Sequence, residues 1–392
     1  MKKAIALLLI LCLALTGCSS GDDTKDTKTT PAATATTAPA ATATTAPEAT
    51  TAPEATATPE ATATPEPTTT PEPTATPEPT ATPEPVKISK SEIDFPDNTY
   101  YELPDDYTDG ITQQGTVESF SYTAKKADGT EYEKPAKVYL PYGYDENDKE
   151  TKYNVLYLMH GGGGSENNYL GNGDRNTMFK KIFDKMIETK RCEPVIICAP
   201  SYYVPGQDDT VSAETFYQEF LDYLIPAFES KYNTYAGGDV TPEGIKASRL
   251  HRAFSGFSMG GVCTWTIFEN CLDQVAYFLP MCGDDWVLVG QKGDPDAKAA
   301  ALAEIANNAE CGLDGFLLYP VAGGDIDVAY ENVKPQVEAM EKLTDTFKYC
   351  DNFRDGNFCY CVEIHHGHGG TTVNHAMYTV IPTFFRLDTS VK

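Results

Sequence analysis

Short apolar runs that end in turn residues recur along the C-terminal part of the chain, and they constrain its fold more than any other feature. YNVLYLMHG (153–161) and EPVIICAPS (193–201) are typical of strands that are buried on both faces of a sheet. AFSGFS (253–258), FLLYPVAGG (316–324) and FCYCVEIHHG (358–367) have the same form. Such strands lie parallel to one another, so each pair requires a crossover segment.

The segments between these runs carry apolar residues at helical spacing, which supplies the crossovers. They are MFKKIFDKMIETK (178–190), AETFYQEFLDYLIPAFESKY (213–232) and VKPQVEAMEKLTD (333–345). Upstream, TVESFSYTAK (116–125) and KPAKVYLP (134–141) predict an antiparallel hairpin that leads into the sheet. The alternation of strand and helix predicts an α/β fold with a mostly parallel central sheet and helices on both of its faces.

The first 18 residues have a different pattern. MKKAIALLLILCLALTGC contains two lysines and an apolar run that is too short to span a membrane, which predicts a secretory signal peptide. Its end, Leu15-Thr16-Gly17-Cys18, resembles a bacterial lipobox, in which the cysteine is lipidated and becomes the mature N-terminus. We therefore expect an extracellular protein that is anchored to the bacterial cell membrane through lipid on Cys18. An ordinary signal peptide with a chance cysteine is the alternative.

Residues 19–85 consist largely of Thr, Ala, Pro and Glu, with TATPEP as a recurring unit. Proline recurs every six residues from Pro47 to Pro83, which excludes helix and sheet and favours extended chain. Apart from proline, this stretch has no apolar side chain larger than alanine, so it cannot form a core. We expect a disordered linker that displays residues 86–392, the folded domain, at the cell surface.

The charge and the cysteines limit which partners and metals the folded domain can bind. The chain has 57 acidic and 30 basic residues and a net charge of −27, so we exclude nucleic acid and anionic lipid as partners, whereas a neutral glycan is compatible. The cysteines of the domain include Cys198, Cys263, Cys282, Cys359 and Cys361, which lie within apolar runs and are expected to be reduced core residues. No pair has C-x2-C spacing, which argues against a zinc site.

A candidate nucleophile lies in one of the predicted strand ends. Gly256-Phe257-Ser258-Met259-Gly260 fits the G-x-S-x-G pattern of a nucleophile elbow, in which a strand turns sharply into a helix and exposes the serine hydroxyl. The alternative is an ordinary glycine-rich turn. In an open α/β sheet, ligands bind at the carboxyl ends of the strands. We therefore expect the residues that assist Ser258 to lie at the ends of the other predicted strands.

The first strand ends in His160 and four glycines. Glycines at this place let backbone N–H groups face an oxyanion, as in the HGGG loops of esterases. We expect the N–H of Met259 and that of Gly162 or Gly163 to form the oxyanion hole. A phosphate cradle is the alternative, but neither G-x-G-x-x-G nor a following Lys-Ser or Lys-Thr is present.

Two further strand ends supply an acid and a base. VAGGDIDVAY offers Asp325 and Asp327, and EIHHGHGGTTVNH offers the four histidines His365, His366, His368 and His375. The chain order is then Ser, Asp, His, with the glycine loop ahead of all three, which is the order of α/β-hydrolases. In such a triad the imidazole takes the proton of the serine hydroxyl and the carboxylate orients the imidazole.

The stretches that carry these residues resemble a known family. YNVLYLMHGGGGSENN, HRAFSGFSMGG, FLPMCGDDW, GDIDVAYENVKPQVEAM and HGHGGTTVNHAMYTVIPTFF, which cover nearly all of residues 120–387, are similar to the esterase-D-like enzymes of carbohydrate esterase family one. The family includes feruloyl esterases and acetylxylan esterases of plant cell-wall degradation. The resemblance implies an α/β-hydrolase fold, a serine-acyl intermediate and no cofactor.

The resemblance also selects among the duplicated residues. It implies Asp327 as the triad acid, with Asp325 as the alternative, and His368 as the base, because the family's catalytic histidine precedes a second histidine by seven positions, as His368 precedes His375. The implied substrate is a feruloyl ester on plant polysaccharide such as arabinoxylan. Acetyl esters of xylan are the alternative. Acyl transfer to a sugar and a glycan-binding lipoprotein without turnover are also considered.

The remaining polar residues near strand ends have weaker interpretations. Asp284 and Trp286 follow the strand after the nucleophile helix and are candidates for substrate binding, weighed equally against a role in loop structure. His160 and His251 are interpreted as structural. A metal cluster of the C-terminal histidines is disfavoured, because adjacent His365 and His366 would point to opposite faces of a strand.

Overall fold

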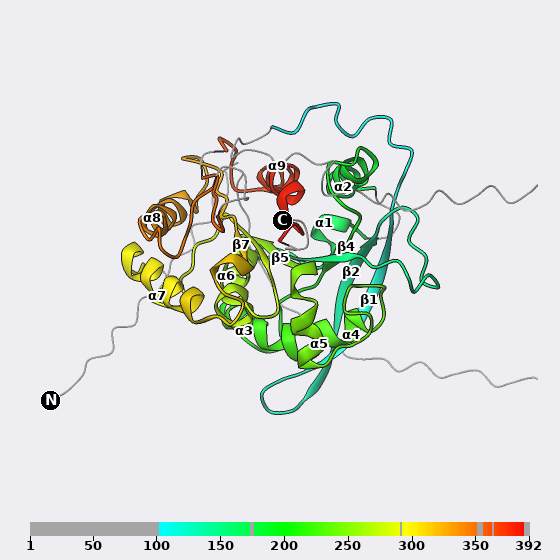
Figure 1. Cartoon of the computed structure of the whole chain (residues 1–392), viewed down its shortest axis with the longest axis horizontal. Helices are drawn as coiled ribbons and strands as arrows, with labels where there is room; N and C mark the ends of the chain where they lie inside the picture. The colour runs from blue at the N-terminus through cyan, green and yellow to red at the C-terminus, as the bar shows by residue number, and fades with distance from the viewer. Residues whose placement is uncertain (1–101, 173–175, 291, 351–355, 363, 388–392) are drawn as a thin grey trace, which may run out of the picture. The chain divides into compact units, whose positions relative to one another are not determined.

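The computed structural model describes residues 102–172, 176–290, 292–350, 356–362 and 364–387. The signal peptide, lipobox and linker predicted for residues 1–85 lie outside the described residues. The described part contains a seven-stranded sheet with the order β1-β2-β4-β3-β5-β6-β7 (Figure 1). The strands are β1 (Thr116–Lys125), β2 (Glu131–Leu140), β3 (Asn154–Met159), β4 (Val195–Ala199), β5 (Arg252–Phe257), β6 (Tyr277–Met281) and β7 (Leu317–Leu318).

Only the pairs at the β1 edge of this sheet are antiparallel. β1 and β2 form the predicted hairpin, and β2 pairs antiparallel with β4. β4, β3, β5, β6 and β7 are all parallel to their neighbours. The predicted α/β fold with a mostly parallel central sheet is therefore confirmed.

Helices cover both faces of the sheet, as predicted. One face carries α1 (Asn167–Leu170), α2 (Met178–Glu188) and α9 (Gly370–Val380) (Figure 1). The other face carries α3 (Asp209–Glu219), α4 (Ile225–Glu229), α5 (Pro242–Ala247), α6 (Met259–Cys271), α7 (Pro295–Asn308) and α8 (Tyr330–Glu341). Short 3-10 turns span Arg249–His251, Leu313–Gly315 and Ile381–Thr383.

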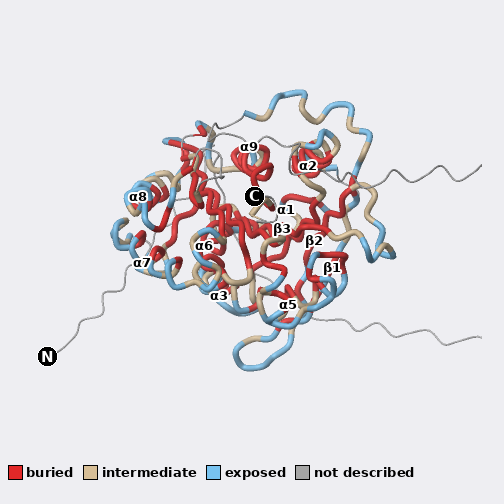
Figure 2. Tube along the Cα trace, viewed as in Figure 1, coloured by how far each residue is buried: buried red, intermediate tan, exposed pale blue. Residues whose placement is uncertain are grey.

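The two faces have separate cores, because side chains alternate along each strand. In β3, Leu156 and Leu158 pack toward α2 and α9, whereas Val155, Tyr157 and Met159 pack toward the α3 and α6 side. Buried residues accordingly concentrate in the sheet and on the inward sides of the helices (Figure 2). Both faces of the parallel strands are therefore sealed from water, which leaves the strand ends for chemistry.

Two predicted strands are shorter than their apolar runs. β7 comprises only Leu317–Leu318, although Tyr319 and Val321 beyond it still donate to the carbonyls of Phe278 and Pro280 in β6. The run FCYCVEIHHG was predicted as a fifth buried strand, which is wrong for most of its length. Its described residues make isolated parallel bridges instead, from Phe358 to Leu318 and Tyr349 and from Cys361 to Val321.

The long helix predicted at 213–232 is divided by a π-helical turn at Phe220–Leu224, between α3 and α4. Pro226 is the second residue of α4, and its missing N–H removes an ordinary helical hydrogen bond at this place. Within the part of the chain that the structure covers, no helix has the length and apolar character that crossing a membrane would take. Cys198, Cys263 and Cys282 are buried free thiols, as expected.

Candidate active site

Ser258 occupies a strained turn between β5 and α6. Its φ is +58° and its ψ is −117°, a conformation that non-glycine residues adopt rarely and that is retained only where the surroundings impose it. Its N–H donates to the carbonyl of Met281 at 2.8 Å, which ties the turn to the end of β6. A Cβ on Gly256 would lie 2.1 Å from the carbonyl oxygen of Gly260, so the turn requires glycine there.

The glycine loop after β3 packs directly against this turn. A Cβ on Gly161 would lie 3.2 Å from the Cβ of Ser258, and one on Gly260 would lie 2.4 Å from the carbonyl oxygen of Met159. The two segments thus meet backbone against backbone. This contact brings the N–H groups of residues 161–164 to the neighbourhood of Ser258.

The two glycines considered for the oxyanion hole differ in their surroundings. The N–H of Gly163 donates to the hydroxyl of Tyr203 at 2.8 Å, so this donor is already engaged. A Cβ on Gly162 would make ordinary contact, at 3.5 Å, with the Met259 side chain, which places Gly162 beside the first residue of α6. The N–H of Met259 belongs to the first turn of α6, where backbone donors have no partner within the helix. The geometry therefore favours Gly162 over Gly163 as the second donor.

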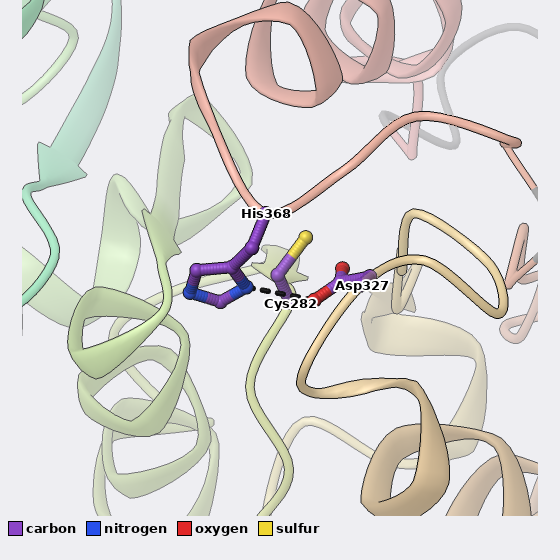
Figure 3. Close-up of side chains that lie close together, drawn as sticks. All are labelled: Cys282, Asp327 and His368. Carbon is purple, nitrogen blue, oxygen red and sulfur yellow. Dashed lines mark hydrogen bonds and ion pairs between the residues drawn. The ribbon is translucent and has the colours of Figure 1, made fainter. Parts of the chain in front are cut away.

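Asp327 and His368 lie on two separate loops that meet beside the nucleophile turn. Asp327 lies in the loop between β7 and α8, and His368 lies two residues before α9. Nδ1 of His368 and Oδ1 of Asp327 are 2.7 Å apart (Figure 3). Asp325, the alternative acid, is exposed to solvent. Of the two carboxylates that the sequence offered, the structure thus places Asp327 on the histidine.

The backbone of its own loop holds the Asp327 carboxylate in place. Oδ1 also accepts from the N–H of Ala329 at 2.9 Å, and Oδ2 accepts from that of Gly323 at 2.8 Å. Burial alone would raise the pKa of Asp327, but the hydrogen bonds from His368, from the Cys282 thiol and from these N–H groups outweigh it and lower the pKa to about 2. The group is therefore a carboxylate in neutral solution. Because a carboxylate only accepts, the proton of the histidine lies on Nδ1.

The imidazole of His368 also packs on the residue that precedes the serine. Its ring centroid is 4.5 Å from that of Phe257, at an interplanar angle of 43°. With Nδ1 bound to Asp327, Nε2 is the ring nitrogen that remains for a second partner. The His368 side chain is 23% exposed, whereas that of Asp327 is fully buried. The imidazole therefore lies between the buried acid and the open side of the site.

Other histidines have structural surroundings. His160 is completely buried between the carbonyl of Gly161 and the hydroxyl of Ser201, and burial lowers its pKa. His251 lies at the opposite end of β5 from the serine and contacts Asn154 at 2.8 Å. Neither lies where proton transfer to the candidate nucleophile is available.

The C-terminal histidines near His368 do not form a ligand cluster of three. The ring centroids of His366 and His375 are 4.4 Å apart, and Nδ1 of His375 accepts from the N–H of Leu103. His365 is exposed, with a φ of +58°, and it lies in a loop rather than on the predicted strand. In the described ranges, the one group of three potential ligands is Cys282, Asp327 and His368, whose ligand atoms lie within 4.8 Å of one another.

Cys282 is a neighbour of the acid that the sequence analysis treated as an ordinary core residue. It follows β6 directly, and its Sγ lies within 4.8 Å of an oxygen of the Asp327 carboxylate (Figure 3). Burial, together with the charge of Asp327, raises the pKa of this thiol well above its ordinary value, so it remains protonated. No local motif marks such a residue. Its position at the end of a strand beside the nucleophile was the available signal.

The two residues considered for substrate binding differ from each other. Asp284 is 3% exposed and forms an ion pair with Lys298 of α7, so for this residue the structure favours the alternative, a role within the loop. Trp286 is partly exposed, and its Nε1–H donates to Glu214 of α3 at 3.0 Å. Trp286 therefore remains available to contact a ligand.

A cavity of 260 Å³ borders the site between α2 and α9. It contacts Phe257, which precedes Ser258, and Gly370, which follows His368 by two residues. Tyr169, Phe179 and Val373 give it a largely apolar wall. A larger cavity of 520 Å³ lies between the end of α6 and α7 and has none of the predicted site residues in its lining.

Comparison with known proteins gives a consistent result. The Esterase family model matches residues 129–267, which contain the glycine loop and Ser258. Endo-1,4-beta-xylanase Y of Acetivibrio thermocellus is 41% identical over 286 residues, which are 73% of this chain and 24% of that protein. The chain thus spans about a quarter of the length of the curated relatives that it matches.

This chain covers a much larger share of the solved structures than of the curated relatives. A mutant of the feruloyl esterase module from Clostridium thermocellum, complexed with sinapinate, is 39% identical with a TM-score of 0.64, and the match covers 74% of this chain and 94% of that one. A ferulic acid esterase from the anaerobic fungus Anaeromyces mucronatus, at 20% identity and a TM-score of 0.52, shares the fold, with coverage of 73% and 97%.

Proposed function

Because this chain belongs to the feruloyl esterases of carbohydrate esterase family one, which are serine carboxylic ester hydrolases, we propose that its described domain hydrolyses feruloyl esters on plant cell-wall xylan. The catalytic residues of this proposal are Ser258, Asp327 and His368. The observation that carries them is the 2.7 Å contact of His368 with Asp327, beside a strained serine turn. The proposal needs no cofactor.

The first half of the reaction forms an acyl-enzyme. Nε2 of His368 takes the proton of the Ser258 hydroxyl while its oxygen attacks the ester carbonyl. The Asp327 carboxylate holds the neutral imidazole in the tautomer with the proton on Nδ1 and then stabilises the imidazolium. The imidazolium then gives its proton to the sugar oxygen as the acyl C–O bond breaks, so that the sugar leaves with a free hydroxyl. Water then attacks the acyl-enzyme with the same histidine as base.

The negative charge that develops on the carbonyl oxygen requires donors that are already in place. We assign this role to the N–H groups of Met259 and Gly162. Each such donor lowers the barrier by about 2.7–4 kcal/mol in comparable sites. The close contact between the glycine loop and the serine turn supports the assignment, because it fixes these donors before substrate binds.

The relatives point to the acyl group. A protein from Xylanibacter ruminicola that is 30% identical over 202 residues is named endo-1,4-beta-xylanase/feruloyl esterase. In this chain, the partly exposed Trp286 presents an aromatic face that can stack on a phenolic ring. An acidic surface, with 57 acidic against 30 basic residues in the chain, is compatible with a neutral polysaccharide.

The proposal is tested by measuring hydrolysis of methyl ferulate and 4-nitrophenyl acetate by the purified wild-type protein and by Ser258→Ala. We expect turnover of methyl ferulate by the wild type and its loss in the variant. Turnover of acetate alone would move the assignment to acetylxylan esterase. A folded wild-type protein that hydrolyses neither ester, and that a fluorophosphonate does not label at Ser258, would point to a glycan-binding protein instead.

We also propose that the protein is lipid-anchored at Cys18 and displayed at the bacterial surface. The sequence Leu15-Thr16-Gly17-Cys18 and the proline-rich residues 19–85 support this, although both lie outside the described residues. Expression of the wild type and of Cys18→Ala in a Gram-positive host tests it. We expect the wild type in the membrane fraction and the variant in the medium or unprocessed. Equal membrane association of two processed forms would contradict the anchor.

A further inference from the structure

Cys282 lies where three parts of the site meet. Its N–H donates to the carbonyl of Val321 at 2.7 Å, which ties it to the segment that leads to Asp327. The next residue, Gly283, lies against the nucleophile turn, because a Cβ there would be 2.6 Å from the carbonyl oxygen of Ser258. Cys282 therefore lies in the segment that links the turn of Ser258 to the loop of Asp327.

The backbone at this position is unusual. Cys282 has a φ of +52° and is one of few non-glycine residues with a positive φ in the described ranges. Glycine would adopt this conformation more readily, yet a side chain is present and 1% exposed. Its Sγ lies within 4.8 Å of an Asp327 carboxylate oxygen, and Figure 3 shows the two side chains side by side. The strained backbone therefore aims a buried donor at the acid.

We propose that Cys282 is a positioning residue of the esterase, whose S–H donates to the Asp327 carboxylate and keeps that carboxylate aligned with Nδ1 of His368. The inference rests on the proposed function of Ser258, Asp327 and His368. Cys282 does not act as a nucleophile, because its thiol remains protonated and faces the acid rather than the open side of the site.

The set of donors on the acid explains why the thiol matters. Asp327 accepts from His368 and from the N–H groups of Gly323 and Ala329, and the proposed bond from the nearby Cys282 thiol gives its two oxygens a fourth donor. The titratable side chains that face it are His368, from the loop before α9, and Cys282, from the end of β6. Loss of the thiol leaves a more basic and less constrained carboxylate. Such a carboxylate holds the imidazolium more tightly and in a less defined orientation.

Three substitutions of Cys282 separate this role from simple packing. Cys282→Ala removes the thiol donor. Cys282→Gly also removes it, and glycine adopts the positive φ of this position without strain. Cys282→Ser keeps a donor of similar size. Cys271→Ala is the matched control, because it removes a buried sulfur from the far end of α6, away from the acid.

The test measures the rate of fluorophosphonate labelling of Ser258, kcat and KM for methyl ferulate, and the pH profile of kcat/KM in the full-length protein. We expect Cys282→Ala and Cys282→Gly to lower the labelling rate and kcat about tenfold, as loss of a hydrogen bond to a charged group does, with KM nearly unchanged. The acidic limb of their pH profiles should move to higher pH. Cys282→Ser and Cys271→Ala should stay within about threefold of the wild type.

The proposal is overturned if Cys282→Gly, folded by circular dichroism, labels at the wild-type rate with an unchanged pH profile. It is also overturned if Cys282→Ser or Cys271→Ala loses as much activity as Cys282→Ala. If Cys282→Ala does not fold, the glycine and serine variants decide the outcome. Failure of the substrate assignment is recognised separately, because the wild type would then be labelled normally at Ser258 without hydrolysing methyl ferulate.

Discussion

Oδ1 of Asp327 lies 2.7 Å from Nδ1 of His368, although 41 positions separate these residues along the chain. The contact depends on two loops at the same edge of the sheet, one before α8 and one before α9. Each loop follows a segment that bridges in parallel to its neighbour, from Met281 to Val321 and from Val321 to Cys361. Because these segments run parallel, the loops that follow them place Asp327 and His368 at the same side of the sheet as Ser258.

This contact predicts that Asp327 and Asp325 differ in their importance for activity. Asp327→Asn should lower kcat/KM for methyl ferulate by about 10³- to 10⁴-fold, because the amide favours the wrong tautomer of the imidazole. Asp325→Asn, a matched change two residues earlier, should stay within about threefold of the wild type, because Asp325 is exposed. Steady-state kinetics of both variants check this, and a larger loss in Asp325→Asn would exchange their roles.

Two neighbouring acids, the partly buried Glu269 and the buried Asp285, predict a pH-dependent stability. Burial, followed by the charge of Asp285, raises the pKa of Glu269 to about 9. The folded protein therefore keeps a proton that the unfolded chain releases above the ordinary carboxyl pKa, so the stability from this group falls as pH rises from about 4.5 to about 9. Glu269→Gln, which stays neutral, should raise the Tm at pH 8 relative to the wild type and leave it similar near pH 4.5.

Thermal unfolding of both proteins from pH 4.5 to pH 9 measures this difference, since other titrating groups contribute equally to each. Parallel Tm curves for the wild type and Glu269→Gln would show that Glu269 is ionised in the folded protein.

The backbone contact beneath the nucleophile predicts a strong steric effect. A Cβ on Gly260 would lie 2.4 Å from the carbonyl oxygen of Met159, a backbone atom that cannot move aside. Gly260→Ala should therefore destabilise the protein by about 1–3 kcal/mol or more and abolish activity. Gly369→Ala is the control, because a Cβ there meets no atom within 4 Å. Urea unfolding compares them, and equal stability of the two variants would contradict the predicted clash.

The partly exposed indole of Trp286 predicts an effect that depends on the substrate. Trp286→Ala should raise KM for methyl ferulate by about two- to tenfold, since an aromatic pair contributes about 0.5–1.5 kcal/mol beyond its area. KM for 4-nitrophenyl acetate should change less. Glu214→Gln, which alters the acceptor of the indole N–H and leaves the ring in place, is the control. An equal rise in KM for both esters would remove Trp286 from phenolic recognition.

The sequence predicted the sheet and the nucleophile turn because both depend on local pattern. Strand periodicity does not require knowledge of distant contacts, and the glycines around Ser258 follow from the turn itself. The extent of β7 was less predictable, since the strand is only Leu317–Leu318 although the apolar run and the hydrogen bonds from Tyr319 and Val321 to β6 continue beyond it.

The residues that surround Asp327 could not be predicted from local sequence pattern. Asp325 and Asp327 are two residues apart in similar sequence, and only the folded loop places the N–H groups of Gly323 and Ala329 around one of them. Cys282 is a clearer example. Its contact with Asp327 arises from a left-handed backbone and from the packing of two loops, neither of which leaves a signature in the letters MCGDDW.

The glycine contacts around Ser258 bear on how this enzyme can change over evolution. At Gly161, Gly260 and Gly283, the close approach of backbone or of Ser258 itself leaves almost no room for a side chain, so these turns tolerate little variation. The segments that follow them, residues 165–168 after the glycine loop and 286–290 after β6, are exposed or partly exposed and have room for other side chains. New ester specificities can therefore arise by exchange of the outer segments, while the reactive centre is inherited unchanged.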